Sequence, residues 1–127
     1  MQLKMQDLLG FTNFHESVKD KKIPIKTAYK LAKLSNAIEK EVVFYQEKLK
    51  EIIMEYAELN SDGVPTQTED GQGIKIQKGR EEECAKAIVD LQEIEVNLPD
   101  IVFTLEEFND LELTFVELGY ALPFISE

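Results

Sequence analysis

Few residues of this chain have the types and spacing that chemistry at a site requires. His15 is the only histidine and Cys84 the only cysteine, so a Ser-His-Asp or Cys-His arrangement would depend on one residue, and a histidine-based metal cluster is excluded. His15 falls on an apolar stripe with Leu8, Phe11 and Val18. We therefore predict a histidine packed at the boundary of the core. Cys84 also falls on an apolar stripe, and we predict a small buried hydrophobe.

A group of carboxylates near the end of the sequence is the other chemical candidate. Clustered carboxylate oxygens suit an acid/base pair or a hard cation, and this group comprises Glu106, Glu107, Asp110 and Glu112. Thr104 stands three residues before Glu107, which is the spacing of a helix capping box. The sequence also lacks the spacing of an EF-hand loop. We interpret the group as a solvated acidic face, and we predict no catalytic residue, no metal site, no cofactor and no enzyme activity.

Charge is distributed unevenly along the chain. Residues 1–60 hold ten Lys and nine acidic residues, whereas residues 61–127 hold sixteen acidic residues, three Lys and one Arg. From Ala87 to Glu127 there are ten carboxylates and no Lys, Arg or His. A surface of one sign attracts partners of the opposite charge and repels nucleic acid and anionic membrane. A cluster of lysines between Lys19 and Lys33 offers phosphate contacts, but with a net charge of −11 we expect no direct nucleic-acid binding.

Length and composition indicate one soluble domain. A chain of 127 residues with 43% hydrophobic residues is long enough to bury a core without metal or disulfide support. No apolar run is long enough to cross a bilayer, and the first residues lack the apolar core of a signal peptide. We therefore predict a single intracellular domain, 1–127, with no membrane partner.

The most extended pattern is a stripe that alternates steps of three and four residues. It predicts one helix over about 25–59 and consists of Ala28, Leu31, Ser35, Ile38, Val42, Tyr45, Leu49, Ile52, Tyr56 and Leu59. At about 1.5 Å per residue this helix is roughly 50 Å long, so its far end needs a cover. Flanking helices of the same chain can supply that cover, and so can a coiled-coil partner.

The remaining patterns are shorter. They predict helices over 7–20 and 80–94, a one-turn helix over 105–109, and a final helix from about Phe115 to Leu122 that ends at Pro123. Leu3 and Met5 indicate a small edge strand, residues 64–77 a β-hairpin, and residues 95–103 short extended segments. The expected fold class is α+β and mainly helical, with one long central helix packed by two or three shorter ones.

Part of the sequence resembles a known group of proteins. The run from Lys22 to Leu34, the long charged helix, the Gly-containing hairpin and Leu111-Glu112-Leu113-Thr114 together resemble a family of small proteins of unknown function from tailed phages and prophages of Gram-positive bacteria. Phe115 departs from the family pattern, in which we expect a residue such as Pro. The resemblance brings no catalytic residues. It implies a phage protein located in the bacterial host cytoplasm or associated with the virion.

Two hypotheses follow for the function. The first is a non-enzymatic phage protein that acts through protein–protein contact, in virion or tail assembly, with a phage or host protein or a second copy as partner. The second is an acidic host-takeover inhibitor that mimics nucleic acid and blocks a host nucleic-acid enzyme or defence complex. The candidate partner-binding residues are Glu106, Glu107, Asp110, Glu112, Tyr45, Leu49, Ile52 and Tyr56.

Overall fold

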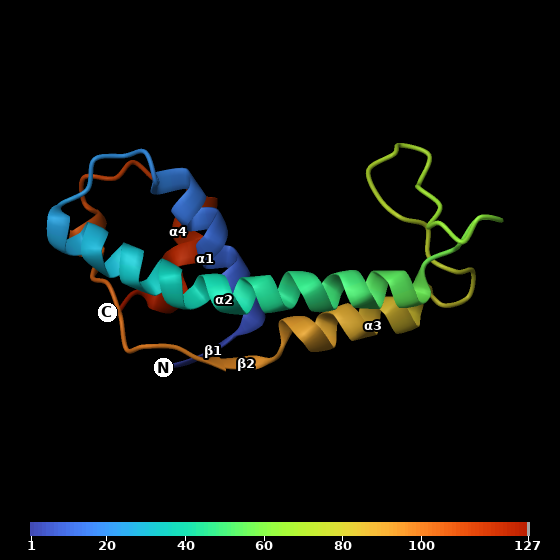
Figure 1. Ribbon diagram of the computed structural model, residues 1–127. Helices are drawn as coiled ribbons and strands as arrows, with labels where there is room; N and C mark the ends of the chain where they lie inside the picture. The colour runs from blue at the N-terminus through green and yellow to red at the C-terminus, as the bar shows by residue number, and fades with distance from the viewer. Residues whose placement is uncertain (127) are drawn as a thin grey trace. The chain divides into compact units, whose positions relative to one another are not determined.

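The chain is mainly helical, with one two-stranded antiparallel sheet. The computed structural model describes residues 1–126 (Figure 1). Its elements are β1 (Gln2–Lys4), α1 (Met5–Val18), α2 (Ile25–Tyr56), α3 (Glu81–Gln92), β2 (Glu95–Asn97), the 3₁₀ helix η1 (Leu105–Phe108), α4 (Phe115–Ala121) and the 3₁₀ helix η2 (Leu122–Phe124). The prediction of a long helix accompanied by shorter ones and a small amount of strand is confirmed at this level.

Two compact units make up the chain. Residues 1–43 and 94–127 belong to unit 1, of which 127 lies outside the described residues, and residues 44–93 form unit 2. Helix α2 contributes its first part to unit 1 and its second part to unit 2. The single domain expected from the length stays a prediction.

Unit 1 is built around buried aromatic rings. Helix α1 presents Met5, Leu8, Phe11, Phe14 and Val18 to the interior, a spacing of three and four that turns one stripe inward. Phe11 lies 4.9 Å from Phe124 between ring centres, and Phe14 lies 5.4 Å from Phe108. Phe103 and Phe108 are a further pair at 5.2 Å. The core of unit 1 therefore depends on segments from both ends of the sequence.

The sheet joins those same two ends. β1 pairs with β2 in antiparallel register, with Leu3 opposite Val96, and the two strands run side by side in Figure 1. The backbone N–H of Met5 donates to the carbonyl of Ile94 at 2.8 Å. The predicted edge strand is confirmed over Gln2–Lys4, but Met5 is the first residue of α1. Of the extended segments expected over 95–103, only Glu95–Asn97 forms a strand.

Helix α2 ends three residues earlier than the stripe predicts. Residues 57 to 59 leave the helix to pair with other extended backbone, because the N–H of Glu58 donates to the carbonyl of Lys75 and the N–H of Thr66 donates to the carbonyl of Glu58. In the expected hairpin region, Gln67 and Ile74 form an antiparallel bridge. The hairpin pairing is thus reduced to isolated bridges, and the described residues 64–77 contain no continuous strand.

The buried stripe of α2 in unit 1 is also shifted from its predicted position. Thr27 and Leu34 are buried although the stripe omits them, whereas Ala28 and Ser35 are only partly buried. Leu31 and Ile38 are buried, as predicted. The hydroxyl oxygen of Ser35 is buried and has no hydrogen-bond partner among the described residues. Between Ala28 and Ile38, the buried stripe of α2 therefore keeps two of the four predicted positions, and at the other two the residue just before is the buried one.

The predicted short helices appear with small changes. The helix over 105–109 is the 3₁₀ helix η1, and the final helix continues through Pro123 as η2. Thr114 caps α4, because its hydroxyl accepts the N–H of Glu117 at 3.1 Å while its own N–H donates to the Glu117 carboxylate at 2.8 Å. At Thr104 only one half of this pair forms: the Thr104 N–H donates to the Glu107 carboxylate at 3.0 Å, while the Glu107 N–H donates to the backbone carbonyl of Thr104.

Two glycines in contrasting backbone conformations give a test of this fold. Gly79, just before α3, has φ of +88°, whereas Gly119 lies within α4 and a side-chain carbon there would meet nothing within 4 Å. Gly79→Ala is expected to destabilise the protein by about 1–2 kcal/mol, because a β-carbon disfavours positive φ. Gly119→Ala is expected to stabilise it by about 0.4–1 kcal/mol through loss of freedom in the unfolded chain. Urea unfolding of both variants measures the difference, and equal effects would contradict the assigned backbone conformations.

Candidate functional site

The exposed side of α2 in unit 1 carries lysines and an aromatic ring. Lys26, Tyr29, Lys33, Asn36 and Lys40 are all exposed and follow one another at steps of three and four, which places them on one face of the helix. We call these five residues the basic face. Ile25 adjoins it and is 84% exposed. Opposite this face, Thr27, Leu31, Leu34 and Ile38 point into the core.

The electrostatics of the basic face are uniform, because it contains no carboxylate. None of the ion pairs of residues 1–126 involves Lys26, Lys33 or Lys40. The ammonium of Lys33 lies 5.8 Å from the centre of the Tyr29 ring, a cation–π distance. Tyr29 itself is 65% exposed. The face therefore offers unpaired cations beside apolar surface, a combination that fits an acidic partner with some apolar groups.

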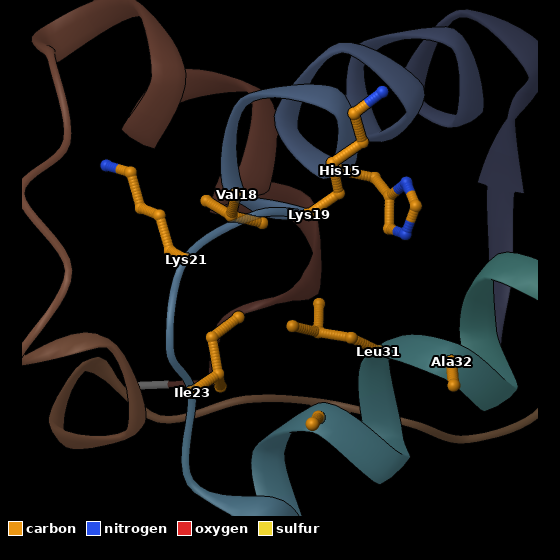
Figure 2. Close-up of a pocket in the computed structure, with 8 residues that line it drawn as sticks. His15, Val18, Lys19, Lys21, Ile23, Leu31 and Ala32 are labelled. Atoms are coloured by element: carbon orange, nitrogen blue, oxygen red, sulfur yellow. The ribbon is translucent and has the colours of Figure 1, made fainter.

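A hollow lies in unit 1 between the end of α1 and the start of α2 (Figure 2). Its volume is about 230 Å³, and its apolar lining includes Val18, Ile23 and Leu31. His15, Lys19 and Lys21 supply the polar part of the lining. Figure 2 shows Val18, Ile23 and Leu31 in the middle of this space, with Lys21 on one side and the His15 ring on the other. His15 is half-buried, which agrees with a boundary histidine.

Two of the cations beside the hollow already have partners. Lys19 lies 2.5 Å from Glu16, and this hydrogen bond and charge raise the pKa of Lys19 and lower the pKa of Glu16. The ammonium of Lys21 donates to the backbone carbonyl of Glu112 at 2.7 Å. This last contact brings the acid-rich segment next to the hollow.

The carboxylate of Glu107 is engaged in contacts within unit 1. Its carboxylate accepts from the Lys30 ammonium at 2.9 Å, from the Thr104 N–H at 3.0 Å and from the Thr27 hydroxyl at 3.3 Å. Burial of the carboxyl raises its pKa, but the hydrogen bonds and the charge of Lys30 outweigh burial, and the pKa is lowered overall. Sequence reasoning recognised the capping contact with Thr104 but missed Lys30 and Thr27, which lie 77 and 80 residues away.

The other three candidate carboxylates, those of Glu106, Asp110 and Glu112, are exposed. Earlier in the acid-rich region, Asp100 pairs with the Met1 ammonium at 2.7 Å, which lowers the pKa of Asp100 through a hydrogen bond and through charge. Glu117 caps α4. Asp90 and Glu93 belong to unit 2, and Glu127 lies outside the described residues. The ten carboxylates are therefore not one continuous set of unpaired charges.

The apolar candidates on the second part of α2 are buried or half-buried within unit 2. Tyr45 is buried and its hydroxyl accepts a hydrogen bond from Gln92 of α3 at 3.4 Å. Leu49, Ile52 and Tyr56 are half-buried, and the Arg80 guanidinium lies 4.4 Å from the centre of the Tyr56 ring. Cys84 of α3 is buried as predicted. Residues of α3 and the residue before it thus cover part of this stripe within unit 2, and partner binding at these positions stays a prediction.

Residues 1–126 show neither a metal-binding cluster nor a membrane-spanning helix. They contain no group of three or more His, Cys, Asp or Glu side chains placed to hold a metal ion. Among the same residues, no helix has both the length and the apolar character that crossing a membrane requires.

Comparison with known proteins adds no family. A scan against protein-family models, a search of curated proteins and a search of solved structures each found no match to this chain.

Proposed function

We propose that this protein is a non-enzymatic binding protein that docks onto an acidic protein through the basic face. The observation that carries the proposal is the stripe Lys26, Tyr29, Lys33, Asn36, Lys40, which is exposed and free of carboxylates in a chain of net charge −11. The proposed setting is the one that the sequence resemblance implies, a phage protein in the host cytoplasm or the virion, with virion or tail assembly as its process.

Local charge supports a protein partner over a nucleic acid. Three lysines on the face give at most a few phosphate contacts, and each contact contributes only a modest, salt-dependent share of affinity. The remaining surface is strongly acidic and repels a polyanion. An acidic protein patch is smaller than a duplex, so it can pair with the basic face without approaching the acidic regions of this chain. Ile25 and Tyr29 then supply apolar contact, with the tyrosine as the natural anchor.

Affinity capture from lysate of the bacterial host, infected or induced, tests this proposal. The wild-type protein is expected to retain an acidic protein partner, and Lys26→Glu/Lys33→Glu is expected to lose it, because each change replaces an attraction by a repulsion. Retention is also expected to fall as salt is raised, since exposed charges are screened. Mass spectrometry identifies the retained protein, and its acidity is read from its sequence.

A matched control uses lysines outside the basic face. Lys75 and Lys78 are exposed residues of unit 2, and Lys75→Glu/Lys78→Glu makes the same change in net charge. This double variant is expected to capture the partner as the wild type does. Equal loss in both double variants would show that net charge matters and the face does not. Retention that nuclease treatment abolishes would show that nucleic acid carries the contact, and would also overturn the proposal.

The exposed carboxylates support a second proposal, nucleic-acid mimicry. Glu106, Asp110 and Glu112 are exposed within seven residues of each other and could present negative charge to a nucleic-acid enzyme. Against this, three other carboxylates already form contacts within unit 1, namely those of Glu107, Asp100 and Glu117. Mimicry requires that the captured protein bind nucleic acid and that added DNA release it. Capture that DNA does not affect would count against mimicry while leaving the first proposal intact.

A further inference from the structure

The hollow between α1 and α2 is large enough for an aromatic ring. An apolar cavity of about 150 Å³ is enough to bind benzene, and this hollow measures about 230 Å³. Its floor includes Val18 and Leu31, which are almost fully buried, while the neighbouring Ala32 and Lys21 are exposed. The hollow thus joins an apolar floor to a rim that carries cations. That combination suits an apolar side chain presented by an acidic segment.

This chain itself presents such a side chain. Phe115, the first residue of α4, is 92% exposed, and Val116 beside it is 59% exposed. The exposed carboxylates of Asp110 and Glu112 precede it, and no Lys, Arg or His occurs between residues 87 and 127. Phe115 and Val116 thus offer a small apolar surface close in sequence to exposed carboxylates, and this surface is free to contact another protein surface.

We infer that the hollow receives Phe115 from a second copy of this chain. The charges on the two surfaces are complementary. Lys21 lines the hollow, and its ammonium bonds to a backbone carbonyl but forms none of the ion pairs of residues 1–126. On the other surface, the exposed carboxylates of Asp110 and Glu112 precede the phenylalanine. Burial of the ring supplies the apolar contribution, and the flanking charges set the orientation of the two copies.

The hollow and Phe115 lie near each other within one copy, and this determines the symmetry of the contact between two copies. Lys21 beside the hollow bonds to Glu112, which precedes Phe115 by three residues, and α4 packs on α1. Because the ring and the hollow lie near each other on unit 1, two copies related by a two-fold axis can each insert Phe115 into the other. Such a contact closes on itself and gives a dimer.

Sedimentation equilibrium of three variants tests the inference. Wild-type protein is expected to dimerise, and Phe115→Ala and Ala32→Trp are each expected to weaken dimerisation at least tenfold, since the first removes a central aromatic and the second blocks the hollow. Both positions are exposed, so circular dichroism should show unchanged folding. Leu59→Ala removes an exposed apolar side chain from unit 2 and is expected to leave dimerisation unchanged.

Mixing the two weakened variants gives a sharper result. Phe115→Ala keeps an intact hollow and Ala32→Trp keeps Phe115, so a mixture can form one insertion where neither variant alone forms any. The mixture is therefore expected to contain a heavier species than either variant does alone. A mixture that behaves as two independent monomers would contradict the insertion. A wild-type protein that stays monomeric at its highest soluble concentration would overturn it outright. Such a monomer that still captured an acidic partner through Lys26 and Lys33 would leave the proposed function standing.

Discussion

Replacement of Phe14 by alanine is expected to lower the free energy of unfolding by about 3–5 kcal/mol, which is the usual cost of deleting a large buried aromatic side chain. Phe14 has no exposed surface, and its ring lies 6.0 Å from that of Phe11 and 5.4 Å from that of Phe108. Deletion therefore removes apolar burial and two aromatic contacts, and it leaves a cavity between α1 and η1. Such a cost is a large share of the stability of a domain of this size.

Phe115→Ala is the matched control for this measurement, because it deletes the same side chain from a position that is 92% exposed. Its effect is expected to stay within about 0.5 kcal/mol, as for other surface substitutions, when unfolding in urea is followed at a protein concentration too low for self-association. A loss of similar size in both variants would contradict the assignment of Phe14 to the core of unit 1.

Replacement of Glu107 by glutamine is expected to cost about 1.5–3 kcal/mol at neutral pH, the range for hydrogen bonds to a charged group. Glutamine keeps the shape of the side chain but loses the charge that holds the Lys30 ammonium at 2.9 Å and the Thr104 N–H at 3.0 Å. Because only 20% of the Glu107 side chain is exposed, solvent screens these contacts less than it screens a surface pair. Glu106→Gln, at an exposed neighbouring position, is the control and is expected to change little.

The direction of the pH dependence follows from the lowered pKa of Glu107. Since the folded state favours the carboxylate, its stabilising contribution is fully present above the unfolded-state pKa, and it is lost as the pH falls through the lower folded-state value. The stability difference between wild type and Glu107→Gln should therefore be largest at neutral pH and shrink on acidification. Urea titrations over this range measure it. A difference that stays constant would show that charge at residue 107 contributes nothing.

Local patterns predicted the helices of this chain because helix periodicity and capping are short-range properties. Thr104 and Thr114 each stand three residues before a glutamate, and in both cases the threonine N–H donates to the glutamate carboxylate. The end of α2 was not predictable in the same way. Residues 57 to 59 have no helix breaker, and they leave the helix because backbone from residues 66 and 75 supplies other hydrogen bonds.

The candidate site was predicted only in part for the same reason. The contacts of Glu107 with Lys30 and Thr27 join residues far apart in sequence, and no spacing rule anticipates them. The basic face was visible in principle, since Lys26, Lys33 and Lys40 are seven residues apart. The lysines from Lys19 to Lys33 stand out in the sequence. Only the structure separates the exposed Lys26 and Lys33, which lie on one face with Tyr29, from Lys30, which pairs with Glu107.

The division into two units has a consequence for synthesis on the ribosome. Unit 2 is one uninterrupted stretch, residues 44–93, while unit 1 needs β1 from the beginning of the sequence and β2, Phe103, Phe108 and Phe124 from the end. Residues 1–43 therefore leave the ribosome without the segments that cover their aromatic side chains. Unit 1 contains the first residue of the chain but is completed after unit 2. During synthesis, unit 2 would therefore fold before unit 1. Helix α1, made early and not yet covered, would be the segment most in need of a chaperone.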